Sequence, residues 1–136
     1  MTDIVYPITI YIDVRYNSEV KKMAITSDLL RGHTETIILA HLLGKDSYGY
    51  EINKSIQEKT KNRYELKEAT LYSAFRRLEE TGSISSYWGD ESTGARRRYY
   101  SVTKLGREIY LKNKEDWEET KEIIDRLKEA VANDEQ

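Results

Sequence analysis

The sequence predicts a mainly α-helical protein of the α+β class, with one small β-hairpin and a long C-terminal helix. Residues 28–82 contain three segments whose apolar residues recur at helical spacing. Residues 83–102 contain two strand-like runs around a turn-rich segment, and residues 104–131 repeat an apolar residue every seven positions. Helical faces recur at i, i+3, i+4 and i+7, whereas half-buried strands alternate, so these patterns distinguish the two kinds of element.

The composition is typical of one globular domain. The chain has 136 residues, of which 34% are charged and 10% aromatic, and a chain of this size can bury a core of its own. It has no cysteine, which excludes disulfides and thiolate chemistry and makes the reducing cytoplasm the expected location. No apolar run approaches the ~18 residues of a membrane span, so we expect no membrane partner.

The charge is distributed unevenly along the chain. Residues 45–106 hold 12 Lys and Arg against 9 Asp and Glu, whereas residues 107–136 hold 6 against 10, within a formal net charge of −2. A basic middle and an acidic C-terminal segment indicate different partners, with an anionic one for the middle.

The first 22 residues are unlike the rest of the chain, and we divide the sequence into an N-terminal extension (1–22), a main domain (23–103) and a C-terminal helix with its tail (104–136). Two interpretations of the extension stay open. Its alternating isoleucines suggest an extra strand that pairs with an exposed edge. Alternatively, it is a translated leader before a native start at Met23, since Glu19-Val20 can be encoded by a stretch that resembles a ribosome-binding site.

Two helices are predicted before residue 60. The first begins at Ser27-Asp28, good N-capping residues, and continues without a break to Gly44. Ser47 is expected to cap the second helix, whose inward stripe contains Ile52 and Ile56 at i, i+4.

A third helix, within residues 65–82, has one apolar face, and Gly82 is the expected C-terminal glycine. The apolar face consists of Leu71, Ala74, Phe75 and Leu78. The opposite face consists of Ala69, Ser73, Arg76 and Glu80, flanked by Tyr72 on one side and by Thr70 and Arg77 on the other.

Residues 83–89 and 96–102 read as the two strands of a hairpin with a charged tip. Thr103 is expected to cap the last helix. That helix has a narrow apolar stripe at heptad spacing, which indicates packing against another helix, most simply that of a second subunit. The predicted dimerisation residues are Tyr110, Trp117, Ile124, Leu127 and Val131.

Helix, helix, helix, hairpin and long helix is the order of a winged helix-turn-helix with a dimerisation arm. The third helix would read the major groove, where arginine can bind guanine or phosphate, and the hairpin would be the wing. Double-stranded DNA is then the expected partner. The predicted DNA-binding residues are Tyr48, Thr70, Tyr72, Ser73, Arg76, Arg77, Arg96, Arg97, Arg98 and Tyr99.

Simpler interpretations remain for several of these side chains. Alternation places Arg97 with Tyr99 on one face and Arg96 with Arg98 on the other, so the three arginines cannot all contact the same phosphates. Without DNA, one or two of them could pair with Asp90 or Glu91 across the turn, and Arg76 could pair with Glu80. Trp88, in the first strand, is expected to pack the hairpin against the third helix.

The segments ATLYSAFRRLEETGSI and ARRRYYSVTKLGRE, together with YGYEI and LLRGHTETIILAHLL, resemble the PadR family of bacterial transcriptional regulators over roughly residues 27–131. EATLY, RRLEETG and ISSYWGDES are similar to its LmrR-like sub-type of multidrug-transport regulators. The chain departs from the commoner family pattern at Ser73 and Phe75, where Pro and Leu are usual. The resemblance implies a homodimeric repressor that binds a pseudo-palindromic operator, with the C-terminal helix packed on the first helix of the partner.

In that sub-type, planar hydrophobic compounds bind at the dimer interface and stack on a tryptophan of the C-terminal helix. The resemblance therefore implies an effector site at Trp117 with its small polar neighbours Asn113 and Thr120, whereas an aromatic at this spacing could equally be dimer core. We expect no catalytic residues, metal site or cofactor, because His33 and His41 have no cysteine nearby and no nucleophile set or phosphate-cradling loop is present. A protein-interaction module without DNA binding, or a regulator without an effector, are the alternatives.

Overall fold

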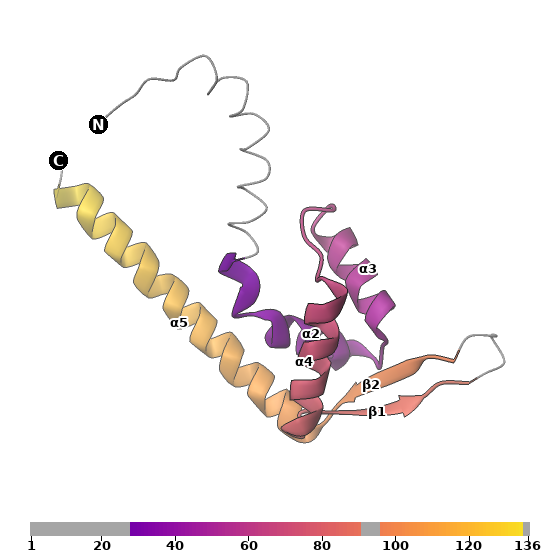
Figure 1. Cartoon of the computed structure of the whole chain (residues 1–136). Coiled ribbons are helices and arrows are strands. Elements are labelled where there is room, and N and C mark those ends of the chain that lie inside the picture. The colour runs from indigo at the N-terminus through magenta and orange to yellow at the C-terminus, as the bar shows by residue number, and fades with distance from the viewer. Residues whose placement is uncertain (1–27, 91–95, 135–136) are drawn as a thin grey trace, which may run out of the picture.

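The computed structural model describes residues 28–90 and 96–134 of the chain. A short helical segment over residues 28–31 precedes the main elements. These follow in the order α2 (Thr34–Gly44), α3 (Gly49–Lys59), α4 (Glu68–Glu80), β1 (Ile84–Trp88), β2 (Arg98–Val102) and α5 (Lys104–Asp134). The predicted mainly helical α+β architecture, a winged helix-turn-helix with a long C-terminal helix, is confirmed (Figure 1).

One hydrophobic core joins α2, α3, α4 and the hairpin. Phe75 of α4 lies at its centre, almost wholly buried, and stacks on the ring of Tyr100 in β2 with the two centroids 3.8 Å apart. The predicted inward faces are confirmed: Ile52 and Ile56 of α3 are buried, as are the four apolar residues expected on α4. Helical spacing of apolar residues therefore placed α3 and α4 correctly.

The two strands form an antiparallel hairpin in which Ile84 pairs with Val102 and Trp88 with Arg98. Its base is tied to the body by Ser47, whose backbone N–H and C=O both bond to Tyr100. From there the hairpin projects away from the core, on the side opposite to the free end of α5 (Figure 1).

The long helix α5 contacts the body over its first half, as far as Trp117, whose ring packs on His33. Thr103 caps it as predicted, because its hydroxyl oxygen accepts the N–H of Gly106 and its hydroxyl donates to the carbonyl of Gly82. Further along, the Asn113 amide donates to the hydroxyl of Thr36 in α2 at 2.9 Å. Beyond these contacts α5 extends away from the body (Figure 1). Within residues 28–90 and 96–134, no helix combines the length and apolar character that crossing a membrane requires.

The prediction of one continuous helix from Asp28 to Gly44 is wrong. Residues 28–31 are helical, but Gly32 and His33 form a turn before α2 begins at Thr34. Glycine is a poor helix former, and the ring of His33 packs edge-on against Trp117 of α5, with the centroids 4.8 Å apart. The turn at Gly32 and His33 thus coincides with a contact to a residue 84 positions away. Helical periodicity within residues 28–44 could not predict that contact.

The predicted cap at Ser47 is also wrong. Tyr48 occupies the N-cap position of α3, and among the described residues no side chain caps that end. The Ser47 hydroxyl instead donates to the carboxylate of Glu51, at 2.5 Å, because its backbone is held against β2. This hydrogen bond, reinforced by nearby Lys45, holds the pKa of Glu51 below its ordinary value despite some opposing burial.

Three of the predictions made from the sequence concern residues or side chains outside the part of the chain that the structure describes. The N-terminal extension lies within residues 1–27, and the charged tip of the hairpin, including Glu91, lies within residues 91–95. Val131 is part of α5, but its side chain is outside the described part.

Candidate nucleic-acid interface

Helix α4 presents one face to the outside of the molecule. Its apolar face is buried, whereas Ala69, Tyr72, Arg76 and Glu80 are exposed and Ser73 is half-buried. This face is bordered by the hairpin on one side and by α2 on the other, since Glu79 contacts the hairpin and Arg77 contacts α2. The predicted reading helix therefore has two distinct flanks.

The hairpin flank is a groove with a volume of about 660 Å³. Its lining residues come from the start of α3, from α4 and from both strands of the hairpin. They are Tyr48, Gly49, Tyr50, Tyr72, Trp88, Arg96, Arg97, Arg98 and Tyr100. The structure thus brings together five of the predicted DNA-binding residues that are up to 50 positions apart in sequence.

Arg97, which lines this groove, and Tyr99 lie on the same face of the hairpin, as strand alternation predicted. The Arg97 guanidinium lies 4.8 Å from the centroid of the Tyr48 ring, and the Tyr99 ring meets the same tyrosine edge-on at 5.3 Å. Tyr99 also stacks on Tyr87 of β1. This aromatic cluster supports Arg97 at the outer end of the paired strands, where Arg97 is exposed.

Arg98 has a different role from Arg97. Its guanidinium pairs with Glu79 of α4, with Nη2 and Oε1 3.1 Å apart, and donates to the hydroxyl of Ser86. The register brings Arg98 over α4, where Glu79 is its acidic partner. The expected pairing of one or two wing arginines with Asp90 or Glu91 stays a prediction, because Glu91 lies outside the described residues.

The expected position of Trp88 is wrong. Its side chain is 53% exposed, and the Arg96 guanidinium lies 4.9 Å from the centroid of its ring. Ile84 and Ser86, on the same face of β1, do contact the body, since Ile84 is buried and Ser86 donates to Glu79. Trp88 is the last residue of β1, and the hairpin projects past the core (Figure 1).

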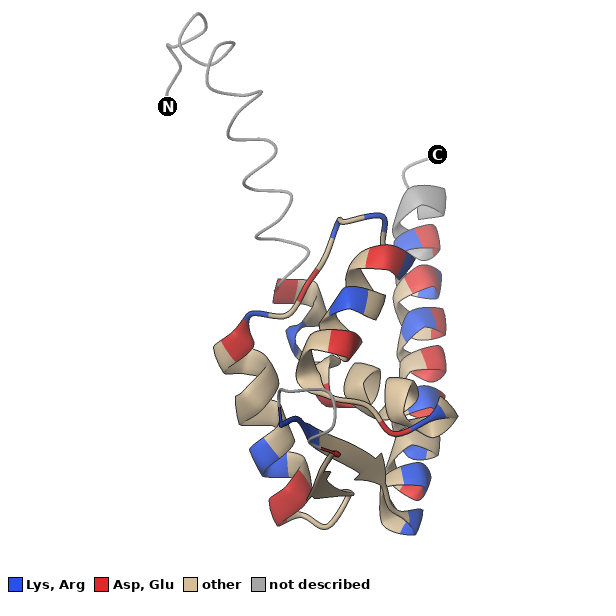
Figure 2. Cartoon of the chain, turned by 90° about the vertical axis from the view of Figure 1, so that its right-hand side faces the viewer, with Lys and Arg blue, Asp and Glu red and all other residues tan. Residues whose placement is uncertain are grey.

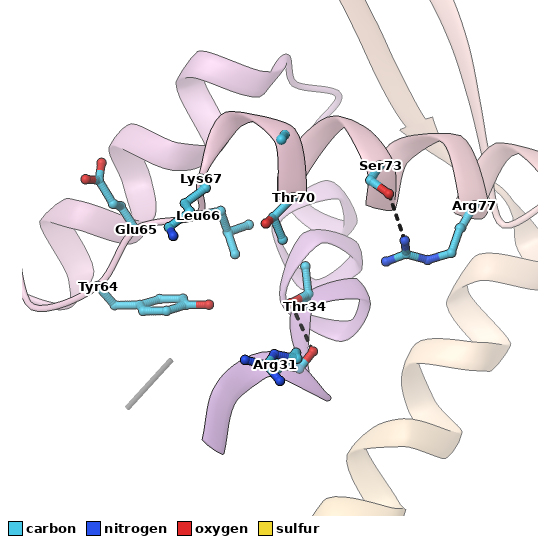
Figure 3. Close-up of a pocket in the computed structure, with 10 residues that line it drawn as sticks. Arg31, Thr34, Tyr64, Glu65, Leu66, Lys67, Thr70, Ser73 and Arg77 are labelled. Atoms are coloured by element: carbon cyan, nitrogen blue, oxygen red, sulfur yellow. Dashed lines mark hydrogen bonds between the residues drawn. The ribbon is translucent and has the colours of Figure 1, made fainter. Parts of the chain in front are cut away.

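The α2 flank of α4 is a second groove, with a volume of about 460 Å³ (Figure 3). It contains the predicted residues Thr70, Ser73 and Arg77. The Arg77 guanidinium donates to the Ser73 hydroxyl at 3.0 Å and pairs with Glu35 of α2 at 2.8 Å.

Sequence reasoning missed five polar residues in this groove: Arg31, Thr34, Tyr64, Glu65 and Lys67. Lys67, immediately before α4, could have been found from its place next to the reading helix. Arg31 and Tyr64 carry no local signal, because only the tertiary packing of residues 28–31 and of the α3–α4 loop beside α4 brings them there.

Arg76 lies between the two flanks on the outward face of α4. It is exposed, and it makes no ion pair with any residue in the described part of the chain, including its expected partner Glu80. Basic residues on α4 and at the start of β2 are visible from the side of the projecting hairpin, whereas acidic and basic residues alternate along α5 (Figure 2).

A third groove, far from α4, lies between α2 and α5. It has a volume of about 470 Å³ and is mostly apolar; Leu29, His33, Ile37, Tyr110 and Trp117 are among its lining residues. Trp117, one of these lining residues, is 42% exposed. Neither of the other two predicted effector residues lines the groove: Asn113 bonds to Thr36 and ties the helices together, and Thr120 is exposed on α5.

Comparison with known proteins identifies relatives across most of this chain. Residues 38–112 match the model of the transcriptional regulator PadR-like family. A protein of Lysinibacillus sphaericus named only as uncharacterized is 46% identical over 107 residues, which cover 79% of this chain and 98% of that protein.

Solved structures are similar as well. A transcriptional regulator from Clostridium thermocellum is 51% identical, with a TM-score of 0.69, over 74% of this chain and 97% of that one. A PadR family transcription regulator from Clostridium difficile is 34% identical, with a TM-score of 0.61, over 70% and 97%. One from Eggerthella lenta is 26% identical, with a TM-score of 0.70, over 84% and 96%.

Proposed function

The chain belongs to the PadR-like family of transcriptional regulators, and from this premise we propose that it is a homodimeric repressor that binds a pseudo-palindromic operator. The proposal includes release from DNA by a hydrophobic or aromatic small molecule, as in the LmrR-like multidrug-responsive sub-type. No catalytic step is part of this function.

The observation that carries the DNA-binding part is the groove between α4 and the hairpin. Tyrosines of α3 and α4 and arginines of the hairpin converge there beside the exposed face of α4. Arginine and tyrosine are common donors to DNA phosphates, and a major groove is wide enough for one helix. In this arrangement the outward face of α4, with Ser73 and Arg76, reads bases, while Tyr48, Arg97 and Arg98 contact the backbone beside it.

The exposed apolar stripe of α5 supports the homodimer. Trp117, Ile124 and Leu127 have exposed fractions of 42%, 42% and 63%, and they recur on one side of a helix that extends beyond its own domain. Tyr110, at the start of this stripe, also packs on the core of its own subunit. A second subunit would cover the exposed part of the stripe and set the spacing of two reading helices.

The apolar groove at Trp117 supports an effector site. Leu29, Ile37 and Trp117 offer apolar and aromatic surfaces, and Glu118 at the edge could attract a cationic compound. Because the groove lies between α2 and α5, its occupation would change how α5 sits on the reading domain, and thus the distance between the two reading helices.

Removing two cations of the wing tests the DNA-binding part. Arg97→Ala with Arg98→Ala should weaken binding to a duplex of the chain's own promoter by roughly tenfold or more at low salt, with a smaller salt dependence. Band shifts at two salt concentrations measure this, and thermal unfolding checks that the variant is folded. A folded, unaltered chain that shows no salt-sensitive, sequence-specific binding would instead favour a protein-interaction module.

Fluorescence tests the effector part. A planar cationic dye should quench tryptophan emission of the chain and of a Trp88→Phe variant, but not of Trp117→Phe, because only Trp117 lines the apolar groove. Quenching that survives in Trp117→Phe, or no quenching at all, would leave a regulator without a small-molecule effector.

A further inference from the structure

We propose that the groove on the α2 flank of α4 is a second contact surface for DNA, where Arg31, Tyr64 and Lys67 hold the phosphates of the strand opposite the one held by the hairpin. This inference rests on the proposed DNA-binding function and adds residues to it. It concerns the side of α4 that the wing does not reach.

The first argument is geometric. A helix lying in the major groove, which is about 12 Å wide, has one sugar-phosphate strand on each side. The wing arginines lie on only one flank of α4, where Arg98 meets Glu79. The opposite flank, marked by Thr70 and Arg77, faces the groove that contains Arg31 and Lys67. Whatever strand passes on that side meets these side chains.

The second argument is the chemistry of the groove. Its polar side chains come from three separate parts of the chain and enclose one hollow, with the phenol of Tyr64 and the guanidinium of Arg77 directed into it from opposite ends (Figure 3). Burial raises the pKa of the Tyr64 phenol, so its hydroxyl stays protonated and can donate. The cations Arg31 and Lys67 and the hydroxyl of Tyr64 are groups of the kinds that proteins commonly use to bind phosphate oxygens.

The acidic residues nearby do not cancel this surface. Glu65, which itself lines the groove, accepts a hydrogen bond from Gln57, and Asp28 pairs with Arg31. The Arg31 and Asp28 side chains are 77% and 67% exposed, and an ion pair so exposed to water is weak. Exchange of the Asp28 carboxylate for a phosphate therefore costs little, and Lys67 is exposed as well.

Phosphate contacts and base contacts have different signatures. A phosphate contact contributes to the salt dependence of binding but carries no direct sequence information. Loss of Arg31 and Lys67 should therefore weaken binding to the promoter duplex and to an unrelated duplex by the same factor. The ratio of the two affinities should stay unchanged.

The experiment compares two double variants of the full chain that remove the same charge. Arg31→Ala with Lys67→Ala alters the proposed surface, and Lys121→Ala with Lys128→Ala removes two exposed cations of α5. Fluorescence anisotropy with labelled promoter and unrelated duplexes, over a series of salt concentrations, gives affinity and salt slope. We expect the first variant to lose about tenfold or more in affinity at low salt and to have a slope smaller by about 2.

The possible results distinguish failure of this inference from failure of the proposed DNA-binding function. Equal affinities and slopes in the two double variants, with specific binding by the unaltered chain, would overturn the inference and leave the proposed function intact. A changed ratio between the two duplexes would also overturn it, because these residues would then read bases. No DNA binding by the unaltered chain would overturn both the inference and the proposed function. Tyr64→Phe, which keeps the ring and removes the donor, should show a smaller loss in the same direction.

Discussion

At the scale of single residues, one arginine of α4 and one of the hairpin beside it already have acidic partners within the chain. Arg77 pairs with Glu35 and Arg98 pairs with Glu79. All four side chains remain between 29% and 53% exposed, and exposed pairs of this kind contribute about 0–1 kcal/mol. In the proposed DNA complex both arginines could therefore leave their carboxylates at little cost, and the carboxylates would compete with the phosphates.

Removing the competitor of Arg77 should strengthen DNA binding. In Glu35→Gln the amide no longer holds the guanidinium by charge, and one negative charge leaves the flank of α4. We expect an affinity for the promoter duplex a few times higher at low salt, with the gain lost as salt rises. Anisotropy titrations measure this change.

Glu122→Gln is the matched control, since Glu122 pairs with Arg126 on α5, far from the reading face. It removes the same charge and should change affinity little. A weaker affinity in Glu35→Gln would mean that Glu35 positions Arg77 for DNA instead of competing for it.

At the scale of elements, α2 connects the two ends of the proposed mechanism. Glu35 reaches α4 through Arg77, and the next residue, Thr36, is bonded to Asn113 of α5. One turn of a helix in the core thus touches both α4 and α5. A shift of α5 would be transmitted to α4 through this turn.

The attachment of α5 depends on a close approach at Gly106. A Cβ at this position would lie 2.1 Å from the carbonyl oxygen of Ser83 and 2.8 Å from a methyl group of Val102. Gly106→Ala must therefore push α5 away from the hairpin base, and we expect a loss of about 1–3 kcal/mol in the free energy of unfolding. Denaturant unfolding followed by circular dichroism measures it.

The contrasting substitution is Gly44→Ala at the end of α2, where an added Cβ meets no atom within 4 Å. Alanine should be neutral or stabilising there, by up to about 1 kcal/mol. Equal stability of the two variants would show that α5 does not need the close contact at Gly106.

At the scale of the whole molecule, charge and apolar surface are divided between two regions. Basic and aromatic side chains gather in the groove between α4 and the hairpin, while the free part of α5 carries an exposed apolar stripe. Acidic and basic residues alternate along α5 (Figure 2). The first region suits an anionic polymer, and the second suits a second copy of the chain. The two regions correspond to the basic middle (residues 45–106) and the acidic C-terminal segment (residues 107–136) of the sequence.

A charge placed on the stripe should separate the subunits. Ile124→Lys would bury an ammonium in the proposed dimer interface, where an unpaired charge is very unfavourable. We expect a folded monomer in analytical ultracentrifugation, with weakened binding to the promoter duplex because two reading helices no longer bind together.

Leu111→Lys provides the comparison, because Leu111 is 58% exposed but lies on the opposite side of α5 from the stripe. That variant should keep the oligomeric state of the unaltered chain. Identical behaviour of the two variants would place any subunit contact elsewhere than on the stripe.

Patterns within short stretches of sequence determined the elements and their inward faces. The apolar spacing of α4, the glycine that ends it and the cap of α5 were all predictable; Gly82 adopts a φ of +79° and Thr103 caps α5. These features depend on residues only a few positions apart, and such local backbone preferences can be predicted from the local sequence.

Only the tertiary structure decided which side chains meet. Arg77 finds Glu35 at a separation of 42 residues, and Asn113 finds Thr36 at a separation of 77. The turn before α2, the exposed position of Trp88 and the groove containing Arg31 depend on packing between elements. Periodicity says which face of an element is buried, but not which partner covers it, because that follows from how all the elements pack around one core.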